Sequence, residues 1–185
     1  MKKVIVITGD LASGKSSLAD SLSLKLSIPA FKKDVIKEHY CDLYGYQTRE
    51  ENRALSKAAV NTMIYFFNKS AVVGDDIILE ANFRTSELQA IKDMAEFYHY
   101  KPLLLLLYGD EGILYQRFLE RLPKRHRAHT SLSLEESLDK FKEYIHSLRE
   151  QDFVFEPICI DVSKLNEKQL LEKVSLIFEE KGIKK

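Results

Sequence analysis

A segment near the amino terminus combines two glycines, a lysine and a serine at a spacing suited to phosphate binding. Residues 9–16 read Gly-Asp-Leu-Ala-Ser-Gly-Lys-Ser, which fits the pattern G-x-x-x-x-G-K-S. Glycines let successive backbone N–H groups converge on a phosphate chain, and a helix that starts there adds its unpaired N–H groups. We expect Lys15 to reach the β- and γ-phosphate oxygens and Ser16 to be a ligand of Mg²⁺. The predicted nucleotide contacts are Gly9, Asp10, Leu11, Ala12, Ser13, Gly14, Lys15, Ser16 and Ser17.

The sequence on either side of this loop indicates a strand before it and a helix after it. Residues 4–7 form a β-branched apolar run, which is typical of a strand buried on both faces. Beyond the loop, Leu18, Leu22 and Leu26 recur at helical spacing. The alternative is a chance match in a glycine-containing turn, and it is disfavoured because strand, loop and helix follow one another in register. The segment therefore predicts binding of a nucleoside triphosphate.

Further apolar segments alternate with helical patterns along the chain. They predict strands at 28–31, 77–79, 103–107 and 158–160. Helices are expected from Val35 to about Tyr44, up to about Gly74, from Ser86, from Asp110 to about Leu122, from Ser133, and from Asn166 to Gly182. The alternation predicts an α/β fold of the three-layer P-loop NTPase type, with a five-stranded parallel sheet and helices on both faces.

In such sheets ligands bind outside the carboxyl ends of the strands, and this rule selects the polar residues of interest. Asp34 follows the second strand and is a candidate general base for a substrate hydroxyl, although it could instead cap a helix. Glu80 ends the third strand and could serve the metal, a substrate hydroxyl, or pairing with Lys15 or an arginine. Asn82 and Arg84 are candidate substrate contacts, and a solvated surface position is the alternative for Arg84.

The same rule assigns three other acidic residues to opposite edges of the sheet. Asp161 follows the last strand and is expected at the ligand-binding edge. Asp75 and Asp76 precede their strand, so we expect them at the opposite edge as solvated turn residues.

A basic segment follows the fourth strand and its helix. It carries four arginines and two histidines, which are Arg117, Arg121, Arg125, His126, Arg127 and His129. Phosphoryl transfer spreads negative charge over the phosphate oxygens, and cations on a mobile segment stabilise that charge while water is excluded. We therefore expect a lid at about 122–132, with Arg117 on the nucleotide, Arg121 and Arg125 on the transferred group, and the histidines in polar contacts. The alternative is a solvated basic helix end.

Bulk composition limits the class of protein. A chain of 185 residues is expected to form one domain, 1–185, and its 28 basic and 28 acidic residues cancel. Zero net charge argues against a general nucleic-acid or anionic-membrane binder. Cys41 and Cys159 lack metal-ligand spacing and predict free thiols in a reducing compartment. With no signal peptide and no apolar run longer than 102–108, a cytoplasmic protein without a membrane span is expected.

Together these motifs resemble those of the small P-loop kinases related to polynucleotide 5′-hydroxyl kinase, chloramphenicol phosphotransferase and the zeta-toxin kinases. Residues 31–37, Phe-Lys-Lys-Asp-Val-Ile-Lys, are similar to the segment that carries this group's hydroxyl-activating aspartate. The likeness implies the base role for Asp34 and a substrate-side role for Lys37. Residues 125–129 resemble a lid that often reads Arg-His-Pro-Gly-His, with Arg-Ala here in place of Pro-Gly. The group implies a central phosphate-loop strand, ATP and Mg²⁺.

These observations predict an ATP-dependent kinase that acts on a hydroxyl of a small molecule. A polynucleotide or nucleoside 5′-hydroxyl is the alternative acceptor, and it is less favoured because the chain is neutral and lacks an aromatic–basic stripe. The alternative of another class is a nucleotide-binding switch or a slow NTPase module.

Overall fold

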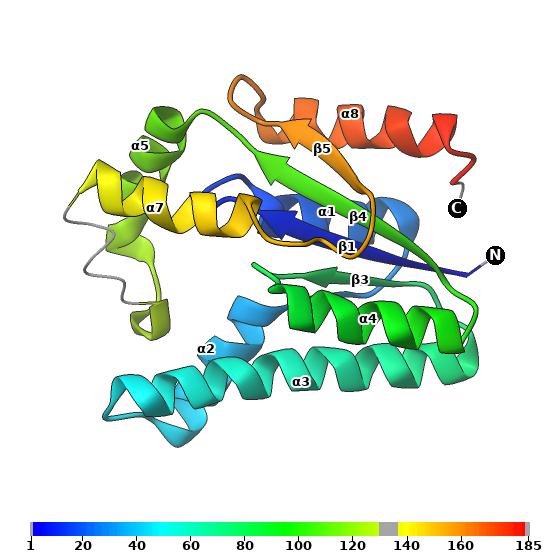
Figure 1. The fold of residues 1–185 in the computed structure, drawn as a ribbon, viewed down its shortest axis with the longest axis horizontal. Coiled ribbons are helices and arrows are strands. Elements are labelled where there is room, and N and C mark those ends of the chain that lie inside the picture. Colours follow the sequence, from blue (N-terminus) through cyan, green and yellow to red (C-terminus); the bar gives the residue numbers. More distant parts are fainter. Residues whose placement is uncertain (1, 130–136, 184–185) are drawn as a thin grey trace.

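A five-stranded parallel sheet forms the centre of the computed structural model, which describes residues 2–129 and 137–183 (Figure 1). The strands are β1 (Lys3–Gly9), β2 (Ala30–Lys32), β3 (Ile77–Glu80), β4 (Lys101–Tyr108) and β5 (Pro157–Asp161). Their order is β2-β3-β1-β4-β5, and all neighbouring pairs are parallel. The expected α/β class, the five parallel strands and the central position of the phosphate-loop strand are confirmed.

Helices cover both faces of this sheet (Figure 1). They are α1 (Lys15–Leu26), α2 (Lys33–Tyr44), α3 (Arg49–Val73), α4 (Thr85–Phe97), α5 (Glu111–Arg121), α7 (Leu138–Arg149) and α8 (Glu167–Glu180), with the 3₁₀ turns η1 (Leu122–Lys124) and η2 (Arg127–His129). α1 and α8 lie on one side of the sheet, and α3 and α4 lie on the other. Within the described residues, no helix combines the length and apolarity needed to cross a membrane.

The position of the central strand β1 between two layers of helices explains why residues 4–7 are all apolar. Ile5 and Ile7 of β1 belong to the core that contains α1 and α8, whereas Val4 and Val6 belong to the core that contains α3 and α4. All four side chains are fully buried. Because successive side chains of a strand point to opposite faces, a strand between two helix layers must be apolar at every position. Each such side chain stabilises the fold by about 1.5–3 kcal/mol.

Helix starts follow the expected capping chemistry at two positions. The Asp110 carboxylate accepts a hydrogen bond from the Ile113 N–H at the start of α5, at 2.9 Å. Asn166 and Gln169 form a reciprocal capping box at the start of α8. Both predicted helix starts are confirmed.

Another helix start differs from the expectation, and one cannot be compared. The Glu87 carboxylate accepts the backbone N–H of Arg84 at 2.8 Å, so the capping residue of α4 is Arg84, two residues before the cap expected at Ser86. The reason is that Glu87 stands three residues after Arg84, the spacing that a capping box requires. The start expected at Ser133 lies outside the described residues, as does the end of the expected lid at 130–132.

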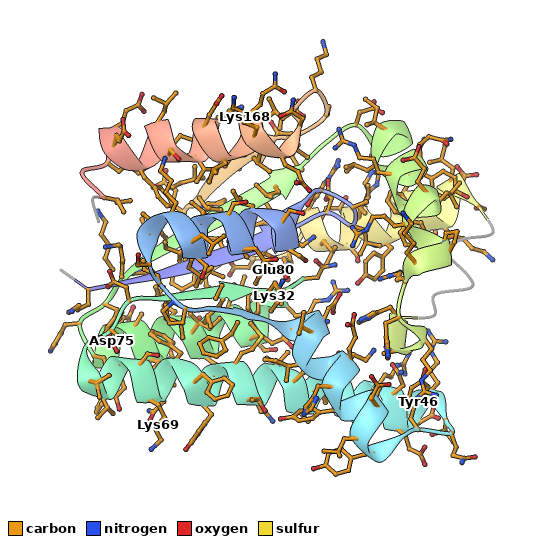
Figure 2. The ribbon with its side chains drawn as sticks, turned by 180° about the vertical axis from the view of Figure 1, so that it is seen from behind. Lys32, Tyr46, Lys69, Asp75, Glu80 and Lys168 are labelled. Carbon is orange, nitrogen blue, oxygen red and sulfur yellow. The ribbon has the colours of Figure 1, made fainter. Side chains whose placement is uncertain are left out.

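The two edges of the sheet separate the acids as the topology requires. Figure 2 shows Glu80 near the end of the sheet that faces α2, and Asp75 at the opposite end. Asp76 is not the solvated turn residue that was expected. Its carboxylate lies 2.7 Å from the Lys3 ammonium and accepts the Lys3 backbone N–H at 2.8 Å. The cause is strand register, because Val4 pairs with Ile77 and so brings the preceding residues, Lys3 and Asp76, side by side.

Close contact between β1 and β4 leaves no room for a side chain at Gly9. Its φ is +124°, and a Cβ would lie 2.0 Å from the Leu107 carbonyl oxygen. We expect Gly9→Ala to lower the free energy of unfolding by about 3 kcal/mol, because overpacking and an unfavourable φ add together. Gly74→Ala is the matched control, because Gly74 is in the left-handed α region (φ +78°, ψ 30°) and only the end of the flexible Lys2 side chain lies within 4 Å of its Cβ, so this variant should cost about 1 kcal/mol. Urea unfolding measures both, and equal losses would contradict the steric argument.

Candidate active site

A cavity of about 570 Å³ lies at the carboxyl end of the sheet. Residues from five regions of the chain line it: the phosphate loop with the start of α1, the start of α2, the end of β3 with the residues after it, α5 with the residues beyond it, and the segment from Val162 into α8. The predicted site residues among them are Leu11, Ala12, Ser13, Gly14, Lys15, Ser16, Ser17, Asp34, Glu80, Asn82, Arg117, Arg121 and Arg125. Residues far apart in the sequence therefore meet where parallel sheets bind ligands.

The phosphate loop turns sharply through backbone conformations that favour glycine. Gly9, Ala12 and Gly14 all have positive φ, at 124°, 58° and 85°. Gly14 is left-handed and immediately precedes the first turn of α1. Successive N–H groups in such a turn form an anion-binding concavity, and the helix start adds positive potential. Ala12 also lines the cavity, and its positive φ is strained for a residue that carries a side chain.

Lys15 is buried at the base of the loop. Its ammonium donates a hydrogen bond to the Asp10 carbonyl oxygen at 2.5 Å and lies 3.5 Å from the Ser13 hydroxyl. Burial lowers the pKa of Lys15, while the carboxylates of Glu80, Asp34 and Asp10 oppose that change. The loop thus holds a cation next to its own backbone, beside the cavity in which a phosphate chain would fit.

Asp10 does not face the cavity, contrary to the expectation that it contacts the nucleotide. Its fully buried carboxylate accepts hydrogen bonds from the Arg149 guanidinium, with Nε 3.0 Å from Oδ1 and 3.2 Å from Oδ2, and Nη2 2.5 Å from Oδ2. It also accepts the Gly109 N–H at 3.1 Å. Asp10 therefore fixes the loop to the end of β4 and to α7. Sequence reasoning missed Arg149, because nothing in the local pattern of α7 points to a partner 139 residues away.

Ser16 and Glu80 form a hydroxyl–carboxylate pair. The Ser16 Oγ donates to Glu80 Oε2 at 3.1 Å, and both residues line the cavity. Burial raises the pKa of Glu80, and the Lys15 ammonium and the Ser16 hydrogen bond oppose this. Two hard oxygen donors next to a phosphate loop fit Mg²⁺, which proteins usually hold through one or two such groups together with phosphates and water.

Asp34 lies in the first turn of α2 and lines the cavity. The residue that caps this helix is Lys32, so the reading of Asp34 as a helix cap is wrong. Half of the Asp34 side chain is exposed, and the Lys33 ammonium lies 3.4 Å from Oδ1. Burial alone would raise the pKa of Asp34, but the nearby cationic groups, the Lys33 ammonium first, outweigh it, so this pKa is lowered. Asp34 is therefore ionised and faces the cavity.

The arginines of α5 and of the residues after it differ in their contacts. Arg117 donates to the carbonyl oxygens of Val162 and Ser163, at 3.2 and 3.1 Å, in the loop between β5 and α8. The Arg125 guanidinium lies 5.4 Å from the centre of the Phe118 ring. Arg121 is exposed at the cavity. Three cationic side chains, Arg117, Arg121 and Arg125, thus line the cavity.

Asp161 stands at the carboxyl end of β5, as expected, but it does not line the cavity. Its carboxylate accepts hydrogen bonds from the backbone and the hydroxyl of Ser163, at 2.9 and 2.6 Å. Asp161 therefore shapes the loop between β5 and α8.

Two predicted substrate contacts lie elsewhere. Lys37 is buried, and its ammonium donates to Asn52 Oδ1 at 2.7 Å and to the Ala128 carbonyl oxygen at 2.8 Å. Arg84 is exposed and donates to the Ser147 carbonyl oxygen at 3.2 Å. Neither side chain lines the cavity. Lys37 stands one turn after Asp34, but its two acceptors, Asn52 of α3 and Ala128 of η2, hold its ammonium on the side of α3.

Residues 126–129 of the basic segment pack onto α2. His129 Nε2 lies 2.8 Å from Glu38 Oε1, and His126 Nε2 lies 3.2 Å from Asp42 Oδ1. The Tyr46 hydroxyl, labelled at the tip of α2 and α3 in Figure 2, donates to the Arg127 carbonyl oxygen at 2.8 Å. The expectation that the two histidines make polar contacts is confirmed.

Comparison with known proteins supports the fold. No family model matches the chain. A curated protein of Pseudothermotoga lettingae, named a nucleotide-binding protein, is 26% identical over 172 residues, which are 91% of this chain and 53% of that protein. The chain thus spans about half the length of the curated relative that it matches.

Solved structures give the same fold with low sequence identity. A candidate kinase of Chloroflexus aurantiacus superposes with a TM-score of 0.79 and 20% identity, over 95% of this chain and 97% of that one. Shikimate kinase from Acinetobacter baumannii, solved with shikimate, gives a TM-score of 0.64 and 15% identity, over 100% and 97%. The chain has the fold of the P-loop kinases.

Proposed function

We propose that this protein is an ATP-dependent kinase that transfers the γ-phosphate to a hydroxyl of a small molecule. One observation carries the proposal: a phosphate loop, the Ser16–Glu80 pair and the ionised Asp34 line the same cavity. Phosphoryl transfer requires a phosphate cradle, a metal ligand and a group that takes the acceptor proton. The compared structures with this fold include kinases, which supports the proposal, although a fold alone does not determine function.

Each group has a distinct task in this proposal. The loop amides and Lys15 hold the phosphates, and Ser16 with Glu80 would hold Mg²⁺, which when bound neutralises charge on the phosphates. Asp34 orients the acceptor hydroxyl and takes its proton as the oxygen–phosphorus bond forms. Arg121 and Arg125 stabilise the negative charge of the group in transfer. Asn82 contributes a polar contact to the acceptor.

We assign the adenine of ATP to the part of the cavity that Arg117 lines. There Arg117 is held by two backbone carbonyl groups, so its planar guanidinium is fixed in orientation and can stack on a base. The loop between β5 and α8 contributes Val162 and Leu165 to the same wall of the cavity.

We further propose that residues 122–132 act as a lid within one kinase domain, in a cytoplasmic protein. Within the P-loop kinases, residues 31–37 favour the group that contains polynucleotide kinase, chloramphenicol phosphotransferase and the zeta-toxin kinases. A small-molecule acceptor is preferred to a nucleic-acid end because the chain has zero net charge. The shikimate bound to the compared kinase is also a small hydroxyl compound.

A transfer assay with γ-³²P-labelled ATP tests the proposal. The purified protein is incubated with sugars, polyols, hydroxylated antibiotics, nucleosides and 5′-hydroxyl oligonucleotides. The expected result is label in a small-molecule product. Label in the oligonucleotides would favour the nucleic-acid alternative, and release of free phosphate alone with every acceptor would favour a slow NTPase module.

A further inference from the structure

His129 lies between two carboxylates of α2. Its side chain is only 8% exposed, with Nε2 2.8 Å from Glu38 Oε1 and Nδ1 4.0 Å from Asp34 Oδ2. Asp34 and Glu38 stand one turn apart on the same helix face. The ring comes from the basic segment, so a residue of the proposed lid reaches the proposed base.

The contact with Glu38 determines which nitrogen of the ring carries the proton. An ionised carboxylate only accepts hydrogen bonds, so Nε2 must donate, and in the neutral ring Nδ1 then offers a lone pair toward Asp34. Burial lowers the pKa of His129, while Asp34 and Glu38 act in the opposite direction, and the ring is neutral near neutral pH. The charged and titratable groups that face it are Asp34, Lys37 and Glu38 of α2, and Arg125 and His126 of the basic segment.

We propose that His129 receives the proton that Asp34 takes from the acceptor hydroxyl, and that Asp34, His129 and Glu38 form a proton relay completed when the lid lies on α2. This inference rests on the proposed kinase function and adds to it a second proton acceptor. It also gives lid closure a chemical consequence, because the relay is incomplete when the lid is open.

The proton and the electrons balance in four events. The acceptor oxygen forms a bond to the γ-phosphorus, and the bond from that phosphorus to the bridging oxygen breaks, with its electron pair leaving on ADP. The hydroxyl proton passes to Asp34. It then passes to Nδ1 of His129, which restores the Asp34 carboxylate and makes an imidazolium whose charge Glu38 balances. When the lid opens, the proton leaves to water.

The exposure of Asp34 and its lowered pKa support proton transfer from Asp34 to His129. Half of the Asp34 side chain is exposed, so its carboxylate can rotate to close the 4.0 Å separation from Nδ1. A carboxylate with a lowered pKa is a weak base, and passing its proton to an imidazole improves the driving force.

Nitrogen-detected NMR of the five histidines tests the coupling without any acceptor. The protein is labelled with ¹⁵N-histidine, and signals are assigned with single His→Gln variants. We expect His129 to carry its proton on Nε2 near neutral pH and to titrate below about 6.5. Asp34→Asn removes a negative charge at 4.0 Å and should lower this midpoint by about 0.5 to 1 pH unit. An Nδ1–H tautomer, or a midpoint that Asp34→Asn leaves unchanged, would overturn the relay.

Turnover separates proton transfer from a purely structural contact. ADP formation from ATP and Mg²⁺ is followed against pH with water as the acceptor. His129→Gln can still donate to Glu38 but cannot take a proton, so kcat should fall about 10- to 100-fold and the acid limb of the kcat profile should disappear, with KM for ATP nearly constant. His126→Gln removes a similar lid contact, to Asp42, and should keep the acid limb.

Each outcome bears on a different claim. A parental rate and pH profile in His129→Gln, or the same loss in His126→Gln, would overturn the relay. If Asp34→Asn abolishes turnover while His129→Gln does not, the relay fails and the kinase proposal stands. If Asp34→Asn turns over at the parental rate, the assignment of the base fails and the relay fails with it.

Discussion

Asp34→Asn is expected to lower kcat for phosphoryl transfer by about 10²- to 10⁴-fold while ATP affinity stays within about twofold. The carboxylate faces the cavity from the first turn of α2, and the amide that replaces it cannot take a proton. ATP affinity is retained because the phosphates are held by the loop on the other side of the cavity. Single-turnover kinetics measure the transfer step, and calorimetry measures ATP binding.

Asp20→Asn is the matched control for this experiment. Asp20 lies on α1, its carboxylate is similarly exposed, and it pairs with Lys32 at 2.6 Å as Asp34 pairs with Lys33. Removing its charge should leave kcat within about twofold of the parent. Equal losses in the two variants would show that a general change of charge, and not loss of the base, reduces turnover.

Lys15→Ala is expected to weaken ATP binding by about 10- to 100-fold and to lower kcat/KM for ATP by about 10³-fold or more. The ammonium is the cation buried at the base of the loop, and three carboxylates act on it. Without it, Glu80, Asp34 and Asp10 would repel the triphosphate. Binding and turnover should therefore fall together, unlike the result for Asp34.

The control for the lysine is Lys25→Ala, on the same helix. The Lys25 ammonium donates to the Ser175 hydroxyl at 2.6 Å, near the end of α1 distant from the loop. This variant should bind ATP with parental affinity. A Lys15→Ala protein that also keeps parental affinity and kcat/KM would contradict the assigned phosphate contact.

The fold could be predicted because its signals are local. The apolar run of β1, the helical spacing after the loop and the capping residues Asp110 and Asn166 each determine a short piece of backbone. Parallel connectivity then brings all strand ends to one edge, which is why Asp34 and Glu80 were placed together without knowledge of side-chain contacts. Strand alternation and topology thus predicted most of the cavity lining.

What the sequence could not predict is the direction of long polar side chains. Asp10 belongs to the loop motif, yet its carboxylate turns away to bind Arg149. Lys37 and Arg84 stand close to the strand ends, yet they contact Ala128 and Ser147. These directions depend on partners 63 to 139 residues away, and local spacing carries no information about them.

The central claim is that backbone amides and a buried lysine at the end of β1 bind the triphosphate of a nucleotide. Isothermal titration of the folded protein with ATP in the presence of Mg²⁺ tests it most directly. One equivalent of ATP should bind, and the same titration of Lys15→Ala should show much weaker binding. A well-folded parental protein that gives no binding heat with ATP or GTP at any temperature tested would contradict the account.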